Sequence, residues 1–327
     1  MPPLNLIEAV NRALLEEMER DPSVLVFGED VGKNGGVFRA TVGLQEKFGE
    51  ERCFDTPVAE SGIIGAAIGL GVCGFKPVVE FQFSGFMYSG FDQIMTHAAR
   101  MRNRSRGRFT VPMVIRMPYC GGIRALEHHS ESTEAIPAHI PGLKVVIPSN
   151  PYDAKGLLIS AIRDPDPVIF MEPKRIYRAF RQEVPDGEFI VPLGKANVIQ
   201  EGADLTIVAW GAMVRETQKA LELLAAKSPQ TSVELIDLRT IKPFDEETIL
   251  ASVRKTGRLI IVHEAPISFG VGAEIAATVS QKELLSLKSP IERIAGPDIT
   301  FPYLLQEHLY LVQPERILEG IEKTMSF

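Results

Sequence analysis

The chain has 327 residues, of which 45% are hydrophobic and 24% are charged, and its formal net charge is −7. This composition is ordinary for a globular protein with one large domain or two medium ones. The negative charge argues against nucleic acid as a partner, because phosphate binding requires a basic surface. No apolar run approaches the roughly 18 residues of a membrane span, so no membrane association is expected.

The cysteines point to a reducing compartment. Cys53, Cys73 and Cys120 are odd in number and form no C-x-x-C pair, so neither a disulfide framework nor a cysteine zinc site is expected. The N-terminal residues Met1 to Leu6 lack the basic and apolar regions of a secretion signal. We therefore expect a cytoplasmic protein.

The first predicted helix begins after Asn5, where Glu8 completes a capping box, and it ends at Asp21-Pro22. The apolar strand Val24 to Phe27 follows, and the short run Arg52 to Phe54 leads into a small-residue helix. Further strands are expected at 78–83, 113–117, 144–148 and 168–172, with helices at 90–101 and 152–163. Short apolar runs separated by helices are typical of a parallel sheet covered on both faces.

Pro185-Asp186-Gly187 and a stretch of mixed charge interrupt this alternation, and we place a domain boundary there. The second half repeats the pattern, with strands at 205–210, 233–236, 259–262 and 291–294 and helices at 213–226, 246–255 and 272–285. Pro314 opens a last helix at its first turn. The sequence predicts two tandem α/β domains with mainly parallel sheets, over residues 1–185 and 186–327.

Glu60 is a carboxylate at a strand-to-helix junction, followed by an almost wholly apolar segment. A carboxylate in the first turn of a helix is favoured by the helix dipole, and the local pattern alone favours this structural interpretation. A carboxylate that enters an apolar wall also needs a partner, because its burial alone is unfavourable. Glu60 is therefore also a candidate functional group.

Three other motifs have both a structural and a functional interpretation. Gly69 to Gly74 matches the letters of a dinucleotide fingerprint, but it ends a helix instead of opening one, so we interpret its glycines as close helix packing. His128 and His129 lie in a loop suited to acid–base chemistry, or form a solvated pair. The five arginines of 100–108 lack interleaved aromatic residues, which favours a subunit interface.

The chain carries a series of ordered motifs that together resemble one family. They are Phe27 to Gly32, Gly35 to Phe38, Asp55 to Glu60, Glu80 to Phe83, Phe91 to Ile94, His129-Ser130, Pro141 to Val146, Pro151 to Leu158, Asp237 to Thr240 and Lys255 to Arg258. The chain resembles, along essentially its whole length, the β subunit of the thiamin-diphosphate-dependent, decarboxylating first component of 2-oxoacid dehydrogenase complexes.

The resemblance implies a fold and an assembly. It implies an N-terminal domain that binds the aminopyrimidine half of thiamin diphosphate and a transketolase-type C-terminal domain. It also implies an α subunit, in a tetramer of two α and two β chains, that holds the diphosphate and magnesium through a motif beginning Gly-Asp-Gly. This chain contains no Gly-Asp-Gly. The dihydrolipoyl acyltransferase core is expected to dock near the C-terminal Phe327.

The resemblance also assigns site residues. Glu60 matches the glutamate that bonds N1′ of the aminopyrimidine and favours its imino tautomer, while Gln82 and Phe86 match positions that line the ring's pocket. His129 matches a histidine implicated with the substrate carboxylate or the lipoyl group. A potassium site is implied at positions that share backbone-carbonyl ligation in relatives: Met113, Ala161, Ile162, Asp164 and Asp166.

The implied activity is decarboxylation of a 2-oxoacid, together with an α subunit, and transfer of the acyl group to a lipoyl arm. Pyruvate is the preferred substrate, because Asn34 to Arg39 and Tyr152 to Asp164 look most like pyruvate-type sequences. Branched-chain 2-oxoacids, a non-catalytic scaffold for the α subunit and a self-contained transketolase-like synthase are the alternatives.

Overall fold

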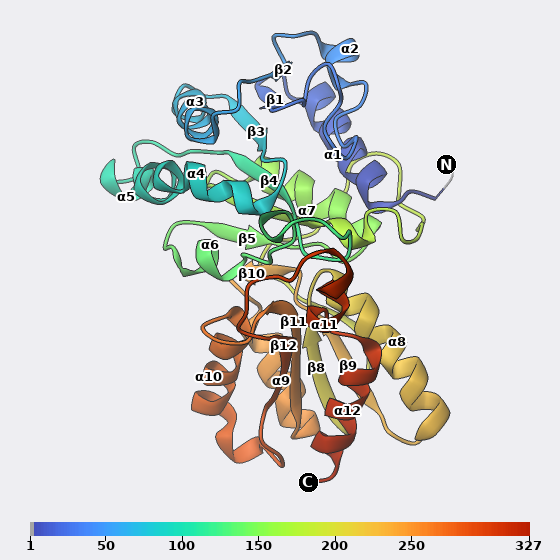
Figure 1. Ribbon diagram of the computed structural model, residues 1–327. Helices are drawn as coiled ribbons and strands as arrows, with labels where there is room; N and C mark the ends of the chain where they lie inside the picture. Colours follow the sequence, from blue (N-terminus) through green and yellow to red (C-terminus); the bar gives the residue numbers. More distant parts are fainter. Residues whose placement is uncertain (1–2) are drawn as a thin grey trace.

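The computed structural model describes residues 3–327, so Met1 and Pro2 of the predicted first domain lie outside the described residues. The chain forms two α/β units stacked along one axis, with the N-terminal half at the top of Figure 1 and the C-terminal half below it. The prediction of two tandem α/β domains with mainly parallel sheets is confirmed.

The first unit is built on a seven-stranded sheet with the order β10-β5-β6-β4-β3-β1-β2. Its strands are β1 (Val24–Gly28), β2 (Cys53–Asp55), β3 (Lys76–Glu80), β4 (Val114–Tyr119), β5 (Lys144–Val146), β6 (Val168–Pro173) and β10 (Thr240–Lys242). All neighbours are parallel except β10, which runs antiparallel to β5. Strand β10 comes from the second half of the chain and so joins the two units.

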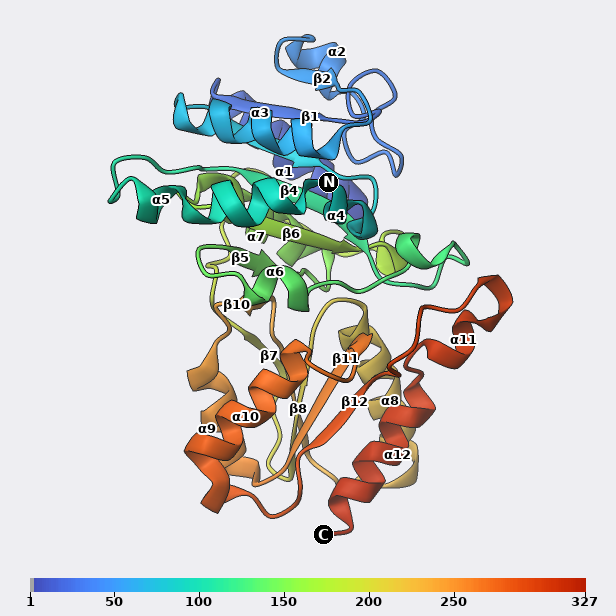
Figure 2. The same cartoon turned by 60° about the vertical axis from the view of Figure 1, so that its left-hand side comes forward.

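Helices cover both faces of this sheet, because successive residues of a strand point to opposite sides. Val24 and Val26 pack with α1 (Leu6–Arg20) and α7 (Pro151–Arg163), whereas Leu25 and Phe27 pack on the side of α3 (Glu60–Val72). The helical segments α4 (Met87–Asp92) and α5 (Met101–Arg104) also lie on the α3 side (Figure 2).

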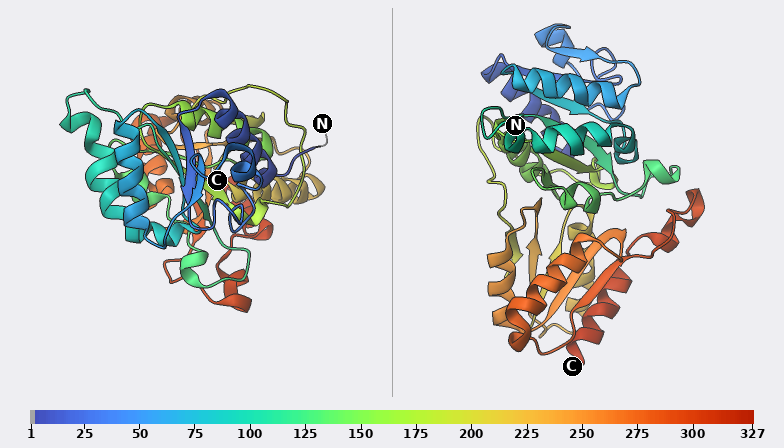
Figure 3. Two further views of the ribbon diagram at one scale, coloured as in Figure 1. Left: turned by 90° about the horizontal axis from the view of Figure 1, so that it is seen from above. Right: turned by 90° about the vertical axis from the view of Figure 1, so that its left-hand side faces the viewer.

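The second unit has a five-stranded sheet with the order β12-β11-β8-β9-β7. Its strands are β7 (Asn197–Gln200), β8 (Leu205–Ala209), β9 (Val233–Asp237), β11 (Leu259–Pro266) and β12 (Glu292–Gly296), and only β7 is antiparallel. One face carries α8 (Ala212–Lys227) and α12 (Pro314–Met325), and the other carries α9 (Glu246–Thr256) and α10 (Val271–Glu283) (Figures 1 and 3). The small helices are α2 (Leu44–Phe48), α6 (Ala135–His139) and α11 (Glu307–Tyr310).

Most predicted elements are present, with two kinds of difference. The capping box at Asn5 and Glu8 and the proline at the start of α12 are as expected. The predicted helix over 90–101 is wrong as a single α-helix, because a π-helical turn at Gln93–His97 and a 3-10 turn at Ala98–Arg100 separate α4 from α5. Strands β7 and β10 were not predicted, since each is short and pairs at the edge of a sheet.

The predicted boundary after residue 185 lies in the segment between β6 and β7. Residues just beyond it still pack on α7 of the first unit: Ser160 Oγ donates to the Val191 carbonyl at 2.7 Å, and Lys155 Nζ donates to the Gly187 carbonyl at 2.9 Å. The boundary at this position therefore cuts through contacts of the first unit. Within residues 3–327, no helix is long and apolar enough to cross a membrane.

Candidate functional site

The strand order of the first sheet reverses at β1: β2 is added on one side of β1, and β3 is added on the other. In open parallel sheets, ligands bind beyond the carboxyl ends of the strands at such a switch point. Three polar segments meet there in this chain: Glu29 and Asp30 follow β1, Glu60 opens α3 after β2, and Gln82 follows β3. The backbones are also close, because a Cβ on Gly28 would lie 2.6 Å from the Glu80 carbonyl oxygen.

Two glutamates lie at this edge, next to Asp30. Glu60 is half-buried in the first turn of α3, and the residue before it, Ala59, offers no capping side chain. Glu29 is buried at 7% exposure, and its Oε1 has no hydrogen-bond partner. Burial first, and then the negative charges of Glu60 and Asp30, raise the pKa of Glu29. Glu29 therefore holds a proton more readily than an ordinary glutamate.

Gln82 is fixed by the loop that follows β1. Its Nε2 donates to Asp30 Oδ2 at 3.0 Å, and Asn34 Nδ2 donates to Asp30 Oδ1 at 2.9 Å. Asp30 itself has a left-handed backbone, with φ of 58°. The loop is held in turn by Asp55, whose Oδ1 accepts from the Gly32 amide at 2.7 Å. The side-chain amide of Gln82 is thus held in place by a hydrogen-bonded network of polar side chains at this edge.

An aromatic cluster brings His129 to the same edge. The His129 ring lies 4.2 Å from the Phe83 ring and 5.3 Å from the Phe86 ring, between centroids. Burial, together with the charges of His128 and Lys174, lowers the pKa of His129. His129 Nδ1 is buried without a partner. The imidazole is consequently kept neutral and has a free nitrogen.

The structure thus brings Glu60, Gln82, Phe86 and His129 to one edge of the sheet, and it adds Glu29 and Phe83, which the sequence reasoning did not assign. Three buried polar atoms there lack partners, namely Glu29 Oε1, Thr56 Oγ1 and His129 Nδ1. Orphaned polar atoms at one edge, with the rings of Phe83 and Phe86 beside His129, fit a planar ligand with ring nitrogens, such as the aminopyrimidine that the resemblance implies. Glu29 could have been found from its place directly after a strand.

The predicted potassium ligands lie apart from this edge, around the ends of β4 and α7. Asp164 accepts two hydrogen bonds from Lys144 Nζ, at 2.7 and 2.6 Å, and Asp166 accepts one from Arg102 Nε at 2.6 Å. The Met113 and Ala161 carbonyls accept from the amides of Val168 and Asp164. Both carboxylates already have a cationic partner, so this donor set fits a bound metal ion poorly. Within residues 3–327, no cluster of three acidic, histidine or cysteine residues could hold a metal.

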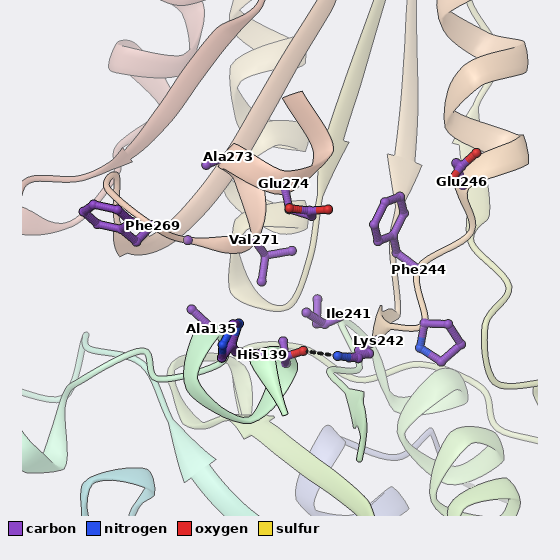
Figure 4. A pocket seen from close by; sticks show the side chains of 13 residues that line it. Ala135, His139, Ile241, Lys242, Phe244, Glu246, Phe269, Val271, Ala273 and Glu274 are labelled. Carbon is purple, nitrogen blue, oxygen red and sulfur yellow. Dashed lines mark hydrogen bonds between the residues drawn. The ribbon is translucent and has the colours of Figure 1, made fainter. Parts of the chain in front are cut away.

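A cavity of about 710 Å³ lies between the two units, away from these residues (Figure 4). It is lined by α6 and β10 on the side of the first sheet and by the start of α10 on the side of the second unit, with Phe269 at its rim. Lys242 Nζ donates to the carbonyl of Ala138, another residue of its lining. None of the predicted site residues lines this cavity.

Comparison with known proteins accounts for both units. The chain matches the transketolase pyrimidine-binding domain family over residues 3–179 and the transketolase C-terminal domain family over residues 194–317. It is similar to solved structures as well, among them one described as "Split gene transketolase, inactive beta4 tetramer", with a TM-score of 0.81, 23% identity and 99% of each chain covered. This likeness shows the fold.

Curated relatives are much more similar in sequence. The chain is 57% identical to the pyruvate dehydrogenase E1 component subunit beta of Acholeplasma laidlawii, over 98% of this chain and 97% of that protein. It is 52% identical to the protein of that name from Bacillus subtilis strain 168 and 51% identical to one from Staphylococcus epidermidis, in both cases over the full length of each chain. The chain therefore belongs to the family of pyruvate dehydrogenase E1 component β subunits, with two domains of the transketolase type.

Proposed function

We propose that the chain is the β subunit of a pyruvate dehydrogenase of the acetyl-transferring type, active only together with an α subunit. Full-length identity above 50% to subunits of that name supports this proposal. The observation that carries it is the meeting of Glu29, Glu60, Gln82 and His129 at the switch point of the first sheet. A scaffold without catalysis has no use for orphaned buried polar atoms at this edge.

The residues at this edge have separable roles. Thiamin diphosphate, when bound, supplies the nucleophilic carbon and the electron sink for decarboxylation. Glu60 holds a proton against the ring nitrogen, with Glu29 beside it as a carboxylate of raised pKa. Gln82 and Phe86 line the ring, and Phe83 supports His129. His129, kept neutral by its lowered pKa, offers Nδ1 to the substrate carboxylate or the lipoyl group.

The remaining assignments are proposals of the same kind. The diphosphate and magnesium are held by the α subunit, in a tetramer of two α and two β chains. The exposed residues of Arg100 to Arg108 offer a surface for subunit contact. The acyltransferase core docks near Phe327, which is exposed two residues beyond α12, and the complex is cytoplasmic.

Glu60→Gln in the reconstituted α–β complex tests the catalytic role. The neutral amide cannot share a proton in the same way, so decarboxylation of pyruvate with a dye acceptor should fall at least about a hundredfold. Glu46→Gln, in the first turn of α2, is the matched control and should keep the wild-type rate. A Glu60→Gln complex that assembles and turns over at the wild-type rate would remove Glu60 from catalysis.

Substrate choice has its own measurement. kcat/KM for pyruvate should exceed the values for branched-chain 2-oxoacids in the reconstituted complex, and the reverse order would favour the branched-chain alternative. Turnover by this chain without an α subunit would instead support a self-contained synthase.

The potassium site that the resemblance implies has a separate test, and the ion pairs of its two carboxylates argue against binding. Because Lys144 and Arg102 neutralise Asp164 and Asp166, replacement of potassium by sodium should leave the unfolding temperature unchanged. A rise in unfolding temperature specific to potassium would show that the carbonyl oxygens bind the ion despite these pairs.

A further inference from the structure

The segment between β4 and α6 carries His129 to the site, and residues 121–132 of it are here called the histidine loop. Its middle is packed tightly on the turn Ser84–Phe86, because a Cβ on Gly85 would lie 2.1 Å from the His128 carbonyl oxygen. Ser84 Oγ also donates to the Glu131 carbonyl at 3.1 Å. The histidine loop has little regular structure, so its ends must be held by something else.

One carboxylate of the second unit binds both ends of the histidine loop. Glu264 Oε1, in β11, accepts the Gly121 amide at 2.7 Å and the Ser132 hydroxyl at 3.0 Å. Glu264 is only 4% exposed. Hydrogen bonds from a backbone amide to a buried carboxylate are stronger than neutral ones and confine the donor. A single side chain thus brings the two ends of the loop together.

A second carboxylate holds the first turn of the loop. Glu307 Oε2, at the start of α11, accepts the amides of Gly122 and Arg124 at 3.2 and 3.1 Å. Gly122 and Arg124 have left-handed backbones, with φ of 91° and 56°. For arginine this conformation is unfavourable, so it persists because the surroundings impose it. Figures 2 and 3 show α11 reaching up beside the loop.

Close packing also joins the start of the histidine loop to the second unit. A Cβ on Gly121 would lie 2.3 Å from Phe301 Cζ, so the second unit leaves room there only for glycine. Lys174, a residue of the first unit, donates from Nζ to the carbonyl of Cys120, which directly precedes the loop. The loop is therefore held between both units, and the carboxylates of the second unit supply its amide acceptors.

We propose that Glu264 and Glu307 are positioning residues, through which the C-terminal domain holds the histidine loop so that His129 stays at the edge with Gln82 and Phe86. This proposal rests on the proposed role of His129. Neither carboxylate touches the site, so both act through the loop.

Hydrogen exchange of the reconstituted α–β complex tests the anchoring. In Glu307→Ala, amides of 121–132 should exchange at least about tenfold faster, because two amide hydrogen bonds are lost and a single one of ordinary strength already corresponds to about that factor. Glu264→Gln keeps an acceptor but loses the charge, and should give a smaller increase. Glu234→Gln is the matched control, because Glu234 is a buried carboxylate of the second unit that accepts the Gly202 amide far along the chain from the loop. Unchanged exchange in Glu307→Ala would overturn the proposal.

A double-mutant cycle then tests action through His129. Glu307→Ala should reduce kcat about tenfold in the wild-type background and add no further loss in a His129→Ala background. Equal losses in both backgrounds would show a general structural effect and overturn the positioning role. A fully active His129→Ala would contradict the proposed role of His129 instead, and faster exchange in Glu307→Ala would still establish the anchoring.

Discussion

Glu134 is a buried carboxylate at the junction of the two units, where its Oε1 accepts a hydrogen bond from Trp210 Nε1 at 3.1 Å. Its Oε2 has no partner. Burial raises the pKa of Glu134 to about 7. The stability that this group contributes is therefore fully present below its ordinary pKa of about 4.5 and is lost as the pH rises through about 7.

Glu134→Gln should consequently stabilise the protein at pH 8 by about 3 kcal/mol and have no effect at pH 4, because glutamine keeps the acceptor for Trp210 and cannot ionise. Urea unfolding can be followed by the fluorescence of Trp210, the only tryptophan of the chain. The exposed Glu51→Gln is the control. A gain in stability of equal size at both pH values would rule out titration of Glu134 as its cause.

Arg116 is a buried cation that is paired with two buried carboxylates. It bonds Glu172 at 2.7 and 3.1 Å and Glu80 at 2.8 Å, and the Tyr177 hydroxyl also donates to Glu172 at 2.7 Å. Arg116→Met should lower stability by about 3–5 kcal/mol, because it leaves two buried carboxylates unpaired. Adding Glu80→Gln and Glu172→Gln should restore most of the loss in urea unfolding. No recovery in the triple variant would mean that the packing of Arg116, not its charge, is what stabilises the sheet.

Single residues were predictable where the sequence showed both their chemistry and their place. Glu60 opens the helix after β2, and Gln82 lies two residues beyond β3, so their meeting at one edge follows from a parallel sheet. The role of Glu264 could not be predicted, because its contact with Gly121 spans 143 positions of sequence. No local pattern encodes a partner that only the packing of two domains brings near.

At the scale of elements, the small-residue segment was correctly predicted to form a helix, α3. The interpretation of its glycines as close packing holds for only some of them. Gly71 does pack, with a Cβ there 3.2 Å from Val111 Cγ1, but Gly65 and Gly69 have nothing within 4 Å. Together with the exposed Ala66 they form a face of small residues open to the outside of this chain. Sequence periodicity could not reveal which face another chain covers.

Gly65→Leu tests whether this face is covered in the assembly. A Cβ at this position meets no atom within 4 Å and Gly65 is exposed, and leucine favours a helix more than glycine does, so the isolated β chain should be as stable or slightly more stable. Assembly with the α subunit, measured by light scattering after size exclusion, should weaken at least tenfold if chains approach closely at α3. Ala226→Leu on the exposed side of α8 is the control. Normal assembly of Gly65→Leu would show that α3 faces solvent in the tetramer.

At the scale of the whole molecule, the two predicted domains are less independent than their sequence periodicity suggests. The pattern of short apolar strands correctly indicated two α/β units, because each buries its own sheet between helices. The pairing of β10 with β5 was not predictable, since three residues are too few to give a pattern and the partner strand lies almost a hundred positions earlier. The candidate site of the first unit also depends on the second unit, because both carboxylates that anchor the histidine loop come from there.

Separate expression of residues 1–185 and 186–327 measures this dependence. The first piece loses β10, which leaves the edge of β5 unpaired, and it loses the cover that Val191 gives to α7. Unpaired edges promote aggregation, so this piece should be insoluble alone and recover on co-expression with the second piece. Extending it to residue 194 restores the cover of α7 but not β10, and should improve solubility only in part. A monomeric 1–185 piece that unfolds cooperatively at the temperature of the full chain would show that the seven-stranded sheet does not need its strand from the second half.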